Sequence, residues 1–72
     1  MNTIKRARLV EGLTQKELAA IIGVSVVAVC KWETGKTFPT PRRLKRISDV
    51  LHISVERLLS DQGGGEPDGA AS

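Results

Sequence analysis

The side chains that could do chemistry in this 72-residue chain are mainly basic. Residues 1–60 hold all eleven Lys and Arg side chains and five acidic ones, which gives that stretch a net charge of +6. Residues 61–72 hold three acidic side chains and no basic one, so they carry −3. Ammonium and guanidinium groups bind phosphate oxygens, and a basic block followed by an acidic tail therefore indicates a polyanionic partner.

Catalytic and metal chemistry have little support in the sequence. A hydrolase needs a strand–turn elbow and a triad partner, and neither accompanies the candidate groups Ser25, Ser54, Ser60 and His52. A single His excludes a His/Cys zinc site of the usual ligand count, and a single cysteine, Cys30, excludes an internal disulfide. We therefore expect no enzyme activity, no metal and no cofactor.

The length of the chain allows one small domain. A fold of about 60 residues buries only about 60% of its unfolded surface, so its stability is marginal and a deep cleft is hard to build. No stretch of about 18 apolar residues could span a membrane, and the N-terminal segment lacks the apolar region of a secretory signal. We expect a soluble, cytoplasmic domain over residues 1–60 and a flexible, Gly-rich, acidic tail over residues 61–72.

Five short helices must position the basic side chains, because capping residues and glycines divide the chain at close intervals. The first helix is expected over residues 3–11, where Ile4, Ala7 and Arg8 share one face, and Gly12 ends it. The other four helices follow the same logic, and no strand is required. The sequence therefore predicts an all-α fold, a compact bundle of five helices.

The second and third helices carry the clearest signals. Thr14 and Glu17 have the spacing of a capping box, and the helix that they start ends at Gly23. Ser25 caps the third helix, which Gly35 ends. The β-branched run after Gly23 would favour a strand on propensity alone, but its burial pattern continues at helical spacing. Buried positions are expected at Leu18, Ala19 and Ile22 in the second helix and at Val29, Trp32 and Glu33 in the third.

The fourth and fifth helices follow a loop over residues 36–39. Thr40 is an N-cap followed by Pro41 at the first helical position, and this helix closes near His52. Ser54 caps the short fifth helix. The apolar faces of these two helices contain Leu44, Ile47, Val50 and Leu51, and then Val55, Leu58 and Leu59. Apolar residues expected on the outside are Leu9, Val10, Ile21, Val55 and one of Leu58 or Leu59.

Residues 15–34 have the pattern of a helix-turn-helix. Two helices can cross steeply where the first has a small residue, here Ala19, and where the turn tolerates a positive φ, here Gly23. Val29 and Trp32 then hold the second helix of the motif in the core. The alternative is that any small helical bundle contains Ala and Gly somewhere, but caps on both helices favour the motif.

Residues 4–59 resemble the Cro and lambdoid-repressor family of helix-turn-helix domains, also called the xenobiotic-response-element family. The matching stretches are Gly12–Ala19, Gly23–Ser25, Trp32–Lys36 and Ile53–Leu59. The resemblance implies a third helix that enters the major groove, and a two-fold homodimer on a partly palindromic operator. It also implies a sequence-specific transcriptional regulator of double-stranded DNA, a repressor of phage, restriction-control or antitoxin type, encoded by a prokaryote or a phage.

The resemblance also implies which residues contact DNA. Base-reading positions fall on Val26, Val27 and Lys31, and the N-termini of the second and third helices place Gln15 and Ser25 against the DNA backbone. The remaining phosphate contacts are expected from the loop and the start of the fourth helix, at Thr34, Lys36, Arg42 and Arg43.

Two of the base-reading positions depart from the commoner pattern, which has polar residues there. Val26 and Val27 cannot hydrogen-bond to a base, but they can pack against the thymine methyl group. Our hypothesis is that Lys31 contacts guanine O6 and N7 while the valines favour thymine. The alternative is that the valines stiffen the helix or contact a protein. In the second case the chain would be a protein–protein interaction module on the same fold.

Three further expectations concern the scaffold and its surface. The family pattern pairs Arg8 with Glu33 as a structural ion pair, the alternative being a solvated arginine. It also points to residues 52–59 as the dimer interface, the alternative being a monomer with scattered surface leucines. Cys30 precedes Lys31, and redox control or an intermolecular disulfide are possible roles. With no activating charge beyond Lys31, we interpret Cys30 as a small, partly exposed residue.

Overall fold

The computed structural model describes residues 3–63, and within that range all regular structure is helical. The five helices are α1 (Thr3–Val10), α2 (Gln15–Ile22), α3 (Val26–Glu33), α4 (Pro41–Leu51) and α5 (Val55–Gly63). The predicted all-α bundle is therefore confirmed. The helical backbone of α5 continues through Gly63, beyond the boundary predicted at residue 60, and the rest of the predicted tail lies outside the described residues.

Local hydrogen bonds explain why the central helices begin and end where they do. The Thr14 hydroxyl accepts a hydrogen bond from the Glu17 backbone N–H at 3.0 Å, and the Glu17 carboxylate accepts one from the Thr14 N–H at 2.8 Å. This reciprocal capping box satisfies two backbone donors that helix geometry leaves free. At the other end of α2, Gly23 has φ +87° and donates its N–H to the Ala19 carbonyl at 2.8 Å. Each of these caps was predicted from the sequence.

All five helices contribute to one hydrophobic core. Its fully buried side chains are Ile4, Leu18, Val29, Ile47 and Leu58, and Ala19, Trp32, Leu44 and Leu51 surround them. Ile22 and Val50 are partly buried and pack against this core. Val55, which we expected on the outside, is also partly buried there, so that expectation is wrong; Leu59 is the exposed residue of the fifth helix.

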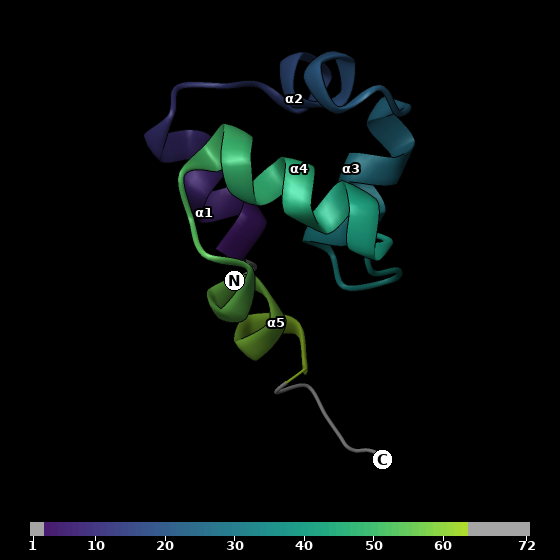
Figure 1. The fold of residues 1–72 in the computed structure, drawn as a ribbon. Helices are drawn as coiled ribbons and strands as arrows, with labels where there is room; N and C mark the ends of the chain where they lie inside the picture. Colours follow the sequence, from purple (N-terminus) through teal and green to yellow (C-terminus); the bar gives the residue numbers. More distant parts are fainter. Residues whose placement is uncertain (1–2, 64–72) are drawn as a thin grey trace.

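The arrangement of the helices separates two surfaces of the domain. In Figure 1, α2 and α3 lie together in the upper part of the molecule, α4 crosses the middle, and α5 lies below. α2 packs mainly against α3, whereas α5 packs against α1 and α4. None of the helices described is long and apolar enough to cross a membrane. A ligand bound to the outer face of α3 would thus leave α5 available for another contact.

Candidate nucleic-acid interface

The outer face of α3 is open to solvent along its whole length. Val26 and Val27 in the first turn have exposed fractions of 43% and 56%, and Lys31 is exposed in the last turn. Val29 and Trp32 point the other way and are buried in the core. Exposed positions at this spacing form one stripe along a helix, which also includes Cys30. The core therefore holds α3 so that the predicted base-reading side chains share one face.

A hydroxyl-bearing residue caps each end of α3. At the start, the Ser25 hydroxyl oxygen accepts from the Ala28 N–H at 3.2 Å, which leaves its own proton free to donate to an anion. At the end, the Thr34 hydroxyl donates to the Cys30 carbonyl at 2.9 Å. The Thr34 backbone N–H also bonds the Cys30 carbonyl, at 3.0 Å. Both donors of Thr34 are thus used within the chain, and its hydroxyl can donate to a phosphate only after it rotates away from Cys30.

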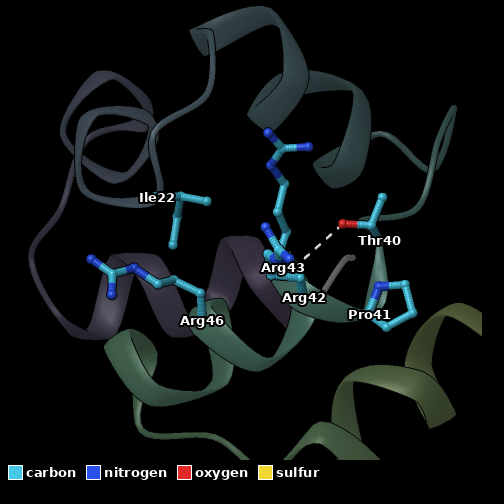
Figure 2. Close-up of a pocket in the computed structure, with 6 residues that line it drawn as sticks. All are labelled: Ile22, Thr40, Pro41, Arg42, Arg43 and Arg46. Atoms are coloured by element: carbon cyan, nitrogen blue, oxygen red, sulfur yellow. Dashed lines mark hydrogen bonds between the residues drawn. The ribbon is translucent and has the colours of Figure 1, made fainter.

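Basic side chains collect where the α4 N-terminus approaches the end of α2. Arg42 and Arg43 lie in the first turn of α4, after the N-cap Thr40, and with Arg46 they line an open hollow of about 470 Å³ beside Ile22. Figure 2 shows Arg46 extending past Ile22, away from the other two guanidinium groups. Within the described residues none of the three forms an ion pair with a carboxylate. Their charge adds to the positive end of the α4 dipole, so this edge of the domain favours an anion.

Arg46 has a specific partner in a neighbouring helix. Its guanidinium donates to the Ile21 carbonyl at 3.3 Å, across 25 residues of sequence. A basic side chain on the last carbonyls of a helix satisfies acceptors that the helix leaves free. The spacing of four residues from Arg42 could have indicated that both lie on one face of α4.

Arg8 and Glu33 form a buried ion pair inside the domain. The Arg8 Nε atom lies 2.7 Å from Glu33 Oε2, and Arg8 Nη2 lies 3.2 Å from Oε1, so the contact is bidentate. Only 7% and 9% of the two residues are exposed. The third nitrogen, Nη1, donates to the Leu13 carbonyl at 2.7 Å. The pair therefore joins α1 to the last residue of α3 and to the loop before α2.

Gln15 begins α2, as expected, but its side-chain amide does not point to solvent. Its amide Nε2 donates to Glu33 Oε1 at 2.9 Å, and the residue is half-buried. The amide donor thus faces the ion pair rather than open solvent. Nothing in the sequence separates the two orientations, because the choice depends on how closely α2 approaches the end of α3.

Apart from Gln15 on α2, the predicted DNA-contacting residues thus form two groups. The first group belongs to α3 and its two ends: the N-cap Ser25, then Val26, Val27 and Lys31, and after the helix Thr34 and Lys36. The Lys36 N–H bonds the Lys31 carbonyl at 2.9 Å. Arg42 and Arg43 lie on a separate element, in the hollow at the start of α4. No group of three or more potential metal ligands occurs among the described His, Cys, Asp and Glu residues. The arrangement offers binding chemistry for an anion next to an exposed helix face.

Comparison with known proteins identifies the helical motif. A family model described as "Helix-turn-helix" matches residues 4–58, well over half of the chain. No solved structure gives a significant match. The family match therefore covers α1 from its second residue, all of α2 to α4, and the first four residues of α5.

Several curated relatives are similar to this chain in sequence. The HTH-type transcriptional activator BcrR of Enterococcus faecalis is 37% identical over 59 residues, which are 82% of this chain and 29% of that protein. The cryptic phage CTXphi transcriptional repressor RstR of Vibrio cholerae is 40% identical over 45 residues, 62% of this chain and 40% of the relative. An uncharacterized HTH-type transcriptional regulator, YonR, derived from the SPbeta prophage of Bacillus subtilis, is 30% identical over 56 residues, 78% of this chain and 52% of the relative. The chain thus spans about half or less of the length of these proteins.

Proposed function

We propose that this chain, which belongs to the Cro/CI-type helix-turn-helix family, is a sequence-specific, DNA-binding transcriptional regulator. The observation that carries the proposal is the exposed outer face of α3. Its inner face is buried in the core, and beside it lie basic side chains that pair with no carboxylate among the described residues. The major groove of B-DNA is about 12 Å wide and accepts one α-helix. The positive edge at Arg42 and Arg43 then faces the phosphates beside the groove.

In this proposal α3 reads bases through one polar and two apolar contacts. Lys31 donates to guanine O6 and N7, and Val26 and Val27 pack against thymine methyl groups. Both valines are exposed enough to be covered by a ligand, since 43% and 56% of their surfaces are open. Ser25, Lys36, Arg42 and Arg43 contact phosphates and position the helix without reading sequence. No enzymatic reaction is part of the proposal.

Substitutions on α3 are expected to change the preferred DNA sequence. Lys31→Ala removes the guanine contact, which is worth about 1–3 kcal/mol of discrimination at one base pair. Val27→Ala and Val26→Ala shorten the side chains that meet thymine, so the preference for T at the facing positions weakens. Selection from a random duplex library, followed by sequencing, measures each change. An unchanged consensus for the two valine variants would remove those residues from the readout.

We also propose that two copies bind a partly palindromic operator. One helix contacts too few base pairs for specificity, and a two-fold dimer places its recognition helices about 34 Å apart, one turn of DNA. A second hollow of about 470 Å³ supports this, because it is lined by exposed apolar residues of the α3–α4 loop and α5, chiefly Phe38 and Leu59, with Leu44 and Val55 beneath. Phe38 lies outside the segment 52–59 predicted from the sequence.

The rim of that hollow has a charge pattern suited to a two-fold contact. Lys45 and Asp49 are four residues apart on α4, and both line the hollow. In a two-fold interface every contact between two different residues occurs twice, once in each direction. Lys45 of one copy can therefore approach Asp49 of the other, and Asp49 of the first can approach Lys45 of the second. Like charges are thereby kept apart while the apolar centre is covered.

Leu59→Glu is expected to weaken dimerisation at least about tenfold, because it places a charge in the apolar centre of the interface. Folding should be retained, since Leu59 is already 46% exposed. Leu9→Glu is the matched control: Leu9 is 54% exposed on α1 and does not line the hollow. Sedimentation equilibrium over a range of concentrations measures both variants. A wild-type chain that stays monomeric at the highest concentrations, or a Leu9 variant equal to the Leu59 variant, contradicts this interface.

The second candidate function is a protein–protein interaction module. The observation in its favour is that Val26 and Val27 expose adjacent apolar surface on α3 and offer no hydrogen bond. A gel shift with duplexes from the random library separates the two functions. No enriched sequence and no salt-sensitive binding would favour the module.

The sign of regulation and the compartment belong to the same proposal. Among the relatives, RstR is named a repressor and BcrR an activator. We propose repression in the cytoplasm of a bacterium, because a domain bound over a promoter blocks polymerase without needing any further contact. A reporter gene preceded by the selected sequence tests this: expression should fall when the protein is produced, and a rise would indicate activation.

A further inference from the structure

Gln15 occupies a position where two roles meet. It is the first residue of α2, and its side-chain amide donates to Glu33 Oε1 at 2.9 Å, across 18 residues of sequence. The backbone N–H groups of the first turn of a helix have no carbonyl partner within that helix. In α2 the Thr14 hydroxyl accepts from the Glu17 N–H, and the N–H groups of Gln15 and Lys16 can meet a phosphate. The main chain of Gln15 can therefore face DNA while its side chain faces the protein interior.

Glu33 holds the C-terminal end of α3 in place. Its carboxylate accepts from Arg8 of α1 through both oxygens and from Gln15 of α2 through Oε1. Glu33 is also the last residue of α3, two positions after Lys31. Two helices thus hold the end of α3 from different sides, and Arg8 is itself fixed by the Leu13 carbonyl at 2.7 Å.

We infer that Gln15 is a positioning residue that sets the orientation of α3 through Glu33, and so links the backbone contact at α2 to the base contacts of α3. This inference rests on the proposed function. Loss of the amide leaves one of the two supports of Glu33, so the last turn of α3, with Lys31, becomes less fixed against the bases. A phosphate contact at the same position would have a different signature.

The signature is the ratio of specific to non-specific affinity. A side chain that only binds a phosphate weakens binding to all sequences by about the same factor. A side chain that orients the recognition helix weakens binding to the preferred sequence more than binding to an unrelated one. Gln15→Met is the informative variant, because methionine has a similar length and cannot donate. Gln15→Lys restores a donor within reach of the Glu33 carboxylate.

The experiment compares the duplex enriched by selection with a shuffled duplex of the same composition, using fluorescence anisotropy at one salt concentration. Gln15→Met is expected to lower the affinity ratio about tenfold, the size of one lost base contact. Gln15→Lys should keep the ratio within about twofold of wild type, because an ionised donor can replace the amide. Lys16→Met is the control, since Lys16 is the exposed neighbour on the same turn and its loss should leave the ratio unchanged.

A second readout needs no DNA. Gln15→Met should speed hydrogen exchange of the backbone amides in the last turn of α3 and leave those of α4 unchanged. Equal weakening on both duplexes, an unchanged ratio, or faster exchange throughout the domain would overturn the inference. If the wild-type chain itself does not prefer one duplex, the proposed function has failed instead, and the two failures are thereby distinguished.

Discussion

Arg8→Ala is expected to lower the free energy of unfolding by about 3–5 kcal/mol, because it leaves the Glu33 carboxylate buried without its counter-charge. Both groups are less than one-tenth exposed, so solvent cannot replace the lost partner. The change also frees the Leu13 carbonyl, which accepts from Arg8 Nη1. A domain of this size has only about 3–9 kcal/mol of stability, and much of it would be lost. Urea or thermal denaturation followed by circular dichroism measures the loss.

Two controls identify the cause of that loss. Arg6→Ala removes an exposed arginine two residues earlier on α1 and should change stability by less than about 0.5 kcal/mol. The double variant Arg8→Ala/Glu33→Ala should lose less than the sum of the two single variants, because residues in direct contact are not additive. An Arg8→Ala protein that unfolds at the wild-type temperature would show that the pair does not fix α3.

Affinity for duplex DNA is expected to fall by roughly 10²–10³ between about 50 and 200 mM salt, the loss that about four to six phosphate contacts per dimer produce. Each contact adds about −0.9 to the slope of log K against log salt, because bound phosphates release counterions. Arg42→Ala and Arg43→Ala remove guanidinium groups from the hollow at the α4 N-terminus, where no described carboxylate neutralises them. If each residue contacts one phosphate, a substitution removes two contacts from the dimer, one per copy, and should make the slope shallower by about 1.8.

The matched control for these arginines is Arg57→Ala. Arg57 lies on α5, beside α1 and the turn after α4. It is not part of α3 and does not line the hollow of Arg42 and Arg43. Its loss should leave the salt slope unchanged. Equal effects of Arg57→Ala and Arg42→Ala would mean that net charge, rather than this edge of the domain, governs binding. An affinity that does not depend on salt would contradict a phosphate-binding role altogether.

Features governed by a few neighbouring residues could be predicted from the sequence. The capping box of Thr14 and Glu17 involves hydrogen bonds across only three residues, and the left-handed Gly23 lies in the turn that these helices require. The helical spacing through Trp32 correctly outweighed the β propensity of the valines, because burial against the core fixes the period. Such signals are sufficient for helix positions and for most of the core.

Features governed by the approach of distant segments could not be predicted from local pattern. Arg8 and Glu33 are 25 residues apart, and only the resemblance to a family suggested their pairing. The bonds of Gln15 to Glu33 and of Arg46 to the Ile21 carbonyl depend on interhelical distances that periodicity does not contain. Val55 is apolar at the start of α5, and its partial burial reflects the packing of α5 on α1 and α4. Long polar side chains that bond from one helix to another are thus the least predictable part of the site.

Selection of duplexes from a random library by the wild-type protein tests the central claim most directly, that the outer face of α3 reads DNA sequence. We predict enrichment of a two-fold consensus whose half-sites are about one helical turn apart. Each half-site should contain a guanine whose selection is lost in Lys31→Ala, and thymines whose selection weakens in Val26→Ala and Val27→Ala. Bound duplexes with no enriched sequence, or a consensus that none of the three substitutions changes, would contradict the claim.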